Sequence, residues 1–170
     1  MATSQSLLEL IAAAQVTAKA FENRISETLK LMDGSVGTDA QVKELRRATK
    51  ALELAAVDIF SIFEARMQHH FKRGPFSRKL KALLLESKEL DLAERLHKYY
   101  LAVNVLKHGK GASYRELLNS PTSLFDVKSP QTANSDKTQP SVSLIDVTAL
   151  GFFAGLTTTI ADAYHFLEDK

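Results

Sequence analysis

The stretch VKELRRATKALELAAVDIFSIFEARMQHHF, residues Val42 to Phe71, decides the fold class. Its apolar side chains recur three or four positions apart, which is the period of one face of a helix. Those positions are Val42, Leu45, Ala48, Leu52, Ala55, Ile59, Ile62 and Phe63. Thr38 or Asp39 supplies an N-cap, and Pro75 cannot continue a helix. We therefore predict a long amphipathic helix that ends near Phe71.

The same period returns on both sides of that helix. The further predicted helices are 4–32, a short one at 76–84, a long one at 92–106 after an interruption at 87–91, a short turn at 113–118, and a last one at 144–167. Residues 119–141 are rich in Ser, Thr, Pro, Asn and Asp, which is typical of a surface loop. We predict one all-α domain over residues 1–170, an up-and-down bundle of four main helices with one or two short extra ones.

The composition fits a protein that folds around its own core. The chain has 170 residues, of which 45% are hydrophobic and 25% charged, and this balance is typical of globular domains. It has no cysteine, which excludes disulfides, thiolate zinc sites and a thiol nucleophile. We expect a reducing, cytoplasmic setting.

We expect no membrane association. The first residues lack the basic region of a secretory signal. The most apolar stretch, Val142–Ile160, carries Ser143, Asp146 and a run of three threonines from Thr157, and this polar content favours a buried bundle helix over a membrane span.

Positive charge gathers in the middle of the chain. From Arg66 to Arg115 there are twelve Lys and Arg against four acidic residues, a net charge of +8 that leaves −6 for the rest. Such asymmetry suits an anionic partner such as RNA, a nucleotide or an acidic protein, and a solvated helix face explains it too.

The end of the 92–106 helix holds the candidate site. Asn104 and His108 are four residues apart and so share one face, and His97 lies eleven residues before His108, about 20° away around the helix. This polar stripe borders the apolar face, where sites in helical bundles are often built. Lys107, Lys110, Tyr114 and Arg115 surround it in the sequence and are candidate binding residues.

Metal binding and cofactors are not expected. His97 and His108 are about 16 Å apart along the helix axis, too far to share one ion. His69 and His70 are adjacent, and adjacent residues of one helix diverge by about 100°. Glycine-rich phosphate loops and nucleophile-elbow serines are also missing from the sequence.

A structural role explains the same residues. Gly109 after His108 suits a helix C-terminus, and Lys107 and His108 complement the negative end of the helix dipole by about 0.3–1 kcal/mol each. Tyr99, Tyr100 and Tyr114 could stack on bases, but tyrosines at helical spacing more often pack in a core. Capping, a binding surface and catalysis all stay open at this point.

The segment from Asn104 through Lys107 and His108 to Gly109, late in a basic helix, resembles the asparagine-to-histidine motif of HEPN (higher eukaryotes and prokaryotes nucleotide-binding) domains. Residues 56–66 resemble the earlier long helix of that family, and the resemblance covers roughly residues 39–110 and the last helix. It implies a helical bundle, frequently a homodimer, and in active members metal-independent RNA cleavage.

The chain departs from the family pattern at one position. Active members carry an arginine immediately before the polar residue, where this chain has Val103. His108 could take the proton of a ribose 2′-hydroxyl, but a cation must also hold the phosphate, and Val103 cannot. Lys107, Lys110 or Arg115 could, although lysine lacks the bidentate fork of arginine.

These observations favour a non-catalytic, HEPN-like, homodimeric protein that binds a protein, nucleotide or RNA partner. One alternative is a metal-independent ribonuclease of the toxin or defence type, with His108 as general base and Asn104 orienting it. The other is a non-enzymatic nucleic-acid binder that uses the basic segment 66–115.

Overall fold

The computed structural model describes residues 4–129 and 143–170. Its helices are α1 (Leu7–Met32), α2 (Asp39–Met67), the 3-10 turn η1 (Gln68–His70), α3 (Phe76–Glu86), α4 (Leu90–His108), α5 (Ala112–Asn119) and α7 (Phe152–Glu168). Among the described residues no β-strand forms, and the predicted all-α class is confirmed.

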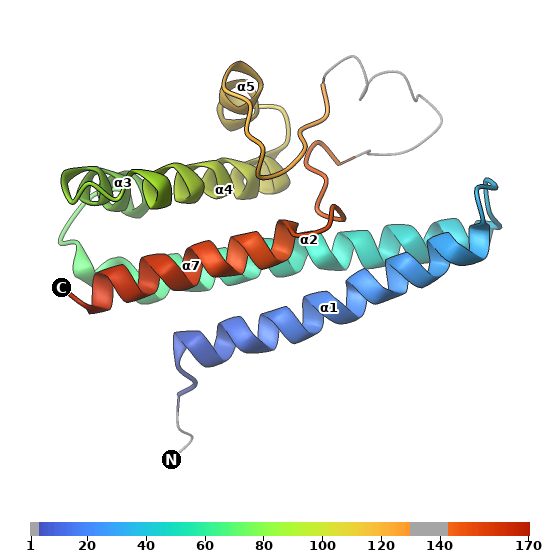
Figure 1. The fold of residues 1–170 in the computed structure, drawn as a ribbon, viewed down its shortest axis with the longest axis horizontal. Helices are drawn as coiled ribbons and strands as arrows, with labels where there is room; N and C mark the ends of the chain where they lie inside the picture. The colour runs from blue at the N-terminus through green and yellow to red at the C-terminus, as the bar shows by residue number, and fades with distance from the viewer. Residues whose placement is uncertain (1–3, 130–142) are drawn as a thin grey trace.

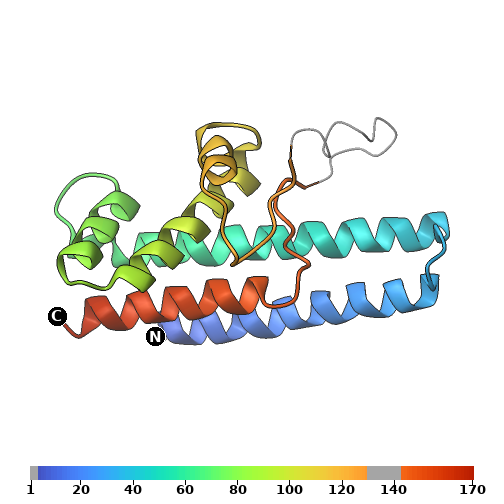
Figure 2. The ribbon, with the colours of Figure 1, turned by 45° about the horizontal axis from the view of Figure 1, so that its top comes forward.

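The four long helices run alternately in opposite directions along the long axis of the molecule (Figure 1). α1 and α2 form an antiparallel hairpin, and α7 lies alongside both, while α4 packs on α2 and α7 from the other side (Figures 1 and 2). α3 and α5 are the short extra helices, and both pack on α4. The predicted up-and-down arrangement of four main helices is thus present.

Helix boundaries follow local signals in the sequence. Ser6 and Thr38 each form a capping box, in which the hydroxyl accepts a backbone N–H and the third helical residue bonds back to the cap. The interruption predicted between the third and fourth helices is present, because α3 ends at Glu86 and α4 begins at Leu90.

One hydrophobic cluster joins α1, α2, α3, α4, α5 and α7. Its largest fully buried side chains include Phe60 and Phe63 of α2, Tyr99 of α4 and Phe152 of α7. Thr157 and Thr159 of α7 sit inside this core because their hydroxyls donate to backbone carbonyls one turn earlier, to Phe153 at 3.1 Å and to Gly155 at 2.8 Å.

The last helix was predicted to begin at Leu144, and this is wrong. Ile145 instead pairs with Val127 in an isolated antiparallel bridge, and the Asp146 carboxylate accepts bonds from the Thr148 N–H and hydroxyl. These local bonds compete with a helix, so α7 starts only after Gly151, whose φ is 92°. Of the predicted loop 119–141, residues 120–129 are irregular, and residues 130–141 lie outside the described part of the chain.

Candidate functional site

α4 ends at His108, as the capping interpretation predicts. Gly109 follows with a φ of 73°, and its N–H donates to the Val105 carbonyl oxygen at 2.8 Å. Lys107 and His108 occupy the last turn with exposed side chains, where positive charge offsets the partial negative charge of the final carbonyls.

The polar stripe of α4 faces α5. His97 Nε2 pairs with the Glu116 carboxylate, and Asn104 Nδ2 donates to Ser113 Oγ at 3.3 Å. Two of the predicted site residues therefore hold α5 against α4. The side chain of His108, one turn after Asn104, has no hydrogen bond or ion pair with any residue in 4–129 or 143–170.

Lys98 adds a buried contact to the same pair of helices. Its side chain is 3% exposed, and Nζ donates to the Ser120 carbonyl oxygen at 2.6 Å and to Ser120 Oγ at 3.0 Å. Glu94 lies 3.8 Å from Nζ on the same helix. The sequence did not reveal this role, because nothing in it distinguishes Lys98 from exposed lysines of the same basic segment, such as Lys88 and Lys107.

Tyr114 is a core residue. Its ring is buried, and its hydroxyl donates to the Lys128 carbonyl oxygen at 2.5 Å. Burial also raises the pKa of Tyr114, so the donating proton is retained over a wide pH range. The ring is thus placed for packing rather than for stacking on a base at the surface.

The arginines that could have completed the site near His108 are engaged elsewhere or exposed. Arg66 Nη1 donates to the Gln5 carbonyl oxygen at 2.8 Å. Arg95 reaches α7, with Nη2 at 3.1 Å from Asp162 Oδ2, whereas His97 and Asn104 of α4 contact α5. Arg115 is exposed, and Val103 is only 1% exposed in the core.

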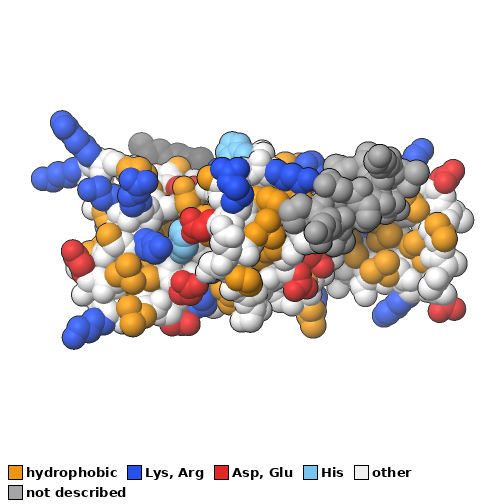
Figure 3. Space-filling view, turned by 90° about the horizontal axis from the view of Figure 1, so that it is seen from above, with side chains coloured by type: hydrophobic (Ala, Val, Ile, Leu, Met, Phe, Trp, Pro, Cys, Tyr) orange, Lys and Arg blue, Asp and Glu red, His pale blue; other side chains and the backbone are white. Residues whose placement is uncertain are grey.

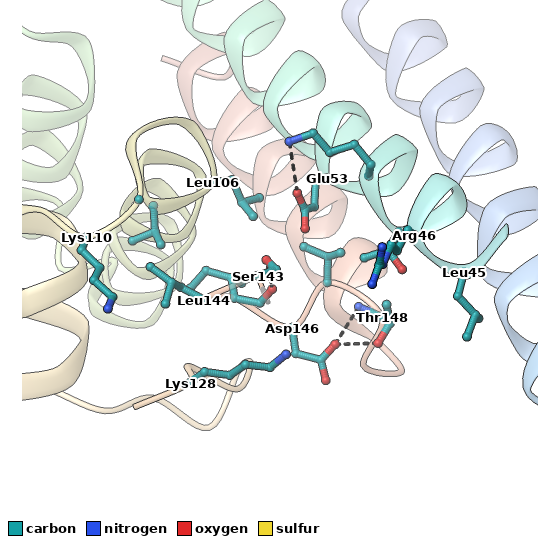
Figure 4. A pocket seen from close by; sticks show the side chains of 16 residues that line it. Leu45, Arg46, Glu53, Leu106, Lys110, Lys128, Ser143, Leu144, Asp146 and Thr148 are labelled. Atoms are coloured by element: carbon teal, nitrogen blue, oxygen red, sulfur yellow. Dashed lines mark hydrogen bonds and ion pairs between the residues drawn. The ribbon is translucent and has the colours of Figure 1, made fainter. Parts of the chain in front are cut away.

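A groove opens beside the end of α4. Its volume is about 840 Å³, and both apolar and polar side chains line it, as in many ligand-binding clefts. Leu45 of α2, Leu106 of α4 and Leu144 are among the apolar lining residues (Figure 4). His108 is not among the lining residues.

Four cations from three segments of the chain line this groove. Arg46 and Lys50 come from α2, Lys110 follows α4, and Lys128 lies in the irregular segment 120–129 that follows α5. Figure 4 shows Lys110 and Lys128 on one side and Arg46 on the other. Two hydrogen bonds fix the backbone of Lys128. Its carbonyl oxygen accepts a bond from the Tyr114 hydroxyl, and its N–H donates to the Leu144 carbonyl oxygen.

The two acidic residues of the groove already have partners. Glu53 Oε2 lies 3.8 Å from Lys50 Nζ, and Asp146 Oδ1 accepts the two Thr148 bonds at 3.0 Å and 2.6 Å. Arg46 is exposed and, within the described chain, has no ion pair.

Sequence reasoning found only Lys110 among the four groove cations. The spacing of Arg46 and Lys50, four residues apart, places them on one face of a helix and was a usable signal. Lys128 carried no such signal, because a loop residue has no period. By contrast, the exposed Lys72, Arg73, Arg78 and Lys79 of the basic segment lie at the end of the molecule formed by α3, where Lys and Arg gather in Figure 3.

Three side chains could hold a metal ion. His69, His70 and Glu168 each place one ligand atom within 4.8 Å of the others. The structure departs here from the predicted divergence of His69 and His70, because α2 ends at Met67 and the two imidazole rings lie with centroids 4.2 Å apart.

Within residues 4–129 and 143–170, no helix combines the length and the apolar character needed to span a membrane. Comparison with known proteins gives no match for this chain, whether to protein-family models, to curated proteins or to solved structures.

Proposed function

We propose that this protein binds a phosphate-bearing ligand, a nucleotide or an RNA strand, in the groove between α2 and the end of α4, without cleaving it. The observation that supports the proposal is the convergence of Arg46, Lys50, Lys110 and Lys128, from three separate segments, on one concave surface. Cations on opposite sides of a cleft can contact successive phosphates, while apolar lining residues can contact a base or sugar.

The net charge of the groove also favours an anionic ligand. Its lining carries four cations against the two carboxylates Glu53 and Asp146, a net charge of +2. The carbonyls that end α4 carry partial negative charge on one wall, and Lys107 and His108 in the last turn offset it.

Binding can be measured by fluorescence anisotropy with a labelled single-stranded RNA of mixed sequence, and by competition with a ribonucleoside triphosphate. We expect affinity to fall steeply with salt, because each phosphate contact releases counterions. Substituting Arg46→Gln together with Lys128→Gln should reduce the slope of log affinity against log salt by about one per lost contact. Competition by the triphosphate at equal strength would identify a nucleotide site, whereas RNA preference would identify a strand site.

Two further double variants remove the same amount of charge elsewhere, one as a control and one as a test of a second basic surface. Lys19→Gln with Lys30→Gln removes two exposed positive charges from α1, away from the groove, and should leave binding unchanged. Arg78→Gln with Lys79→Gln tests the basic end at α3. Loss of binding in that variant alone would favour a nucleic-acid binder that uses the segment 66–115. No binding of either ligand at low salt would refute the proposal.

The ribonuclease alternative is tested in the same samples. RNA fragments that appear with the wild-type protein and disappear with His108→Ala would assign a base to His108 and overturn the non-catalytic proposal. Homodimerisation stays a prediction from the family resemblance, and sedimentation velocity would measure it.

A further inference from the structure

Two histidines and a glutamate come together at the end of the bundle where α2 and α7 both terminate. His69 and His70 belong to η1, and Glu168 is the last residue of α7, 98 positions after His70. We propose that these three side chains bind a divalent transition-metal ion of the Zn²⁺ type. This site is separate from the groove proposed for phosphate.

The spacing of the ligand atoms suits such an ion. Metal–ligand bonds of about 2.0–2.1 Å at a tetrahedral angle separate neighbouring ligand atoms by about 3.4 Å. His70 Nε2 and Glu168 Oε1 are 3.4 Å apart. All three ligand atoms lie within 4.8 Å of one another, so no pair has to approach by more than about 1.4 Å to reach that separation.

One of the histidines has a tautomer that suits coordination. His69 Nδ1 lies 2.9 Å from the Arg66 carbonyl oxygen. A carbonyl can only accept, so Nδ1 carries the proton and Nε2 keeps a lone pair for a metal. Metal-binding histidines in proteins commonly donate their second ring N–H to a backbone carbonyl in this way, which fixes the tautomer and the ring.

The donor set selects the class of ion. Two imidazole nitrogens and one carboxylate suit Zn²⁺ and its neighbours, whereas Ca²⁺ and Mg²⁺ prefer oxygen ligands throughout. Three protein ligands leave a fourth position for water. The side chains of His70 and Glu168 are 23% and 43% exposed, so an ion can enter from solvent.

Bound metal would connect the end of α2 to the last turn of α7. An ion that binds the folded chain and not the unfolded one shifts the equilibrium toward the folded state. At a free Zn²⁺ concentration a hundred times the dissociation constant, Tm should rise by about 5–10 °C.

The test uses the full chain without a polyhistidine tag, first freed of metal with a chelator and then titrated with Zn²⁺ alone. We expect one Zn²⁺ per chain by calorimetry, the rise in Tm, and a visible Co²⁺ absorption band typical of a tetrahedral site. His70→Ala and Glu168→Gln should each weaken Zn²⁺ binding at least tenfold.

His165→Ala is the matched control, because it removes an exposed histidine of the same last turn that is not part of the cluster. Zn²⁺ affinity should be retained in this variant. Equal affinity in the wild type and in Glu168→Gln, or no binding to the wild type, would overturn the proposal. Since Glu168 is exposed, Glu168→Gln keeps the fold even where His70→Ala does not.

Discussion

Lys98 shows how a single charged side chain can serve the core. Its ammonium group satisfies the carbonyl at the end of α5 while its stem is buried in α4. Lys98→Ala should destabilise the protein by about 2–3 kcal/mol, because it opens a cavity and leaves the Ser120 carbonyl without its donor. Urea unfolding measures this loss. Lys19→Ala, an exposed control, should stay within about 0.5 kcal/mol of the wild type.

Gly155 makes room for the hydroxyl of Tyr99. A Cβ at this position would overlap Tyr99 Oη, and Tyr99 is packed between Phe125 and Phe152. Helix propensity alone would favour Gly155→Ala by about 1 kcal/mol. We expect the overlap to dominate, so that Gly155→Ala lowers the free energy of unfolding by about 1–3 kcal/mol, as measured by thermal unfolding.

A double variant isolates this contact. Tyr99→Phe removes the hydroxyl, so the further substitution Gly155→Ala should then cost little or even stabilise the chain. Equal effects of Gly155→Ala in both backgrounds would contradict the explanation.

Glu64 couples stability to pH. Burial raises the pKa of its carboxyl, and the charge of Lys107 and the hydrogen bond from Ser77 only partly oppose this. A raised pKa in the folded state means that the ionised carboxylate is disfavoured by folding, so its contribution to stability is fully present below the unfolded pKa and is lost as pH rises through the folded pKa.

Glu64→Gln should therefore gain stability relative to the wild type at pH 7 and lose that advantage below about pH 4.3, the ordinary range of a glutamate pKa. Urea unfolding of both proteins at the two pH values provides the comparison. A difference that does not change with pH would show that Glu64 has no such role.

At the scale of elements, the end of α4 depends on the backbone of Gly109. Its φ of 73° is disfavoured for residues with a Cβ, although no neighbouring atom would obstruct one. Gly109→Ala should cost about 1 kcal/mol in chemical unfolding. His108→Ala should cost about 0.3–1 kcal/mol, from its interaction with the helix dipole. An unchanged free energy of unfolding in Gly109→Ala would show that the positive φ of residue 109 does not require glycine.

α5 docks through polar contacts that no helix period reveals. His97, Asn104 and Lys98 of α4 meet Glu116, Ser113 and Ser120 respectively. The period predicted that His97 and Asn104 share a stripe, and this is correct. It could not predict that the stripe would be covered by α5, because the partner depends on how the chain turns at residues 109–111.

At the scale of the whole molecule, Arg95 connects α4 to α7. It donates to Asp91 at 2.8 Å, to Thr159 at 3.0 Å and to Asp162 at 3.1 Å, with 24% of its side chain exposed. Because Asp162 is 46% exposed, solvent screens the pair. Arg95→Met should therefore cost only about 1 kcal/mol and increase hydrogen exchange in α7. Unchanged exchange in α7 would show that the apolar core alone holds this helix.

The distribution of charge over the molecule also differs from its distribution along the sequence. Of the cations between Arg66 and Arg115, Lys98 is buried, and Arg66 and Arg95 hold other segments. Three of the four groove cations, Arg46, Lys50 and Lys128, lie outside that stretch. Net charge of a sequence segment therefore did not locate the concave basic surface.

The sequence by itself determined the all-α class, the four long helices, most of their ends and the helix stop at Gly109. These are local properties, set by the period of apolar residues, by caps such as Thr38 and by backbone preferences of glycine and proline. Only the tertiary structure decided which polar side chains meet. Packing assembled the groove and the cluster of His69, His70 and Glu168 from segments far apart in the chain, and it began α7 at Phe152, where long-range pairing of Ile145 overrides the helical period.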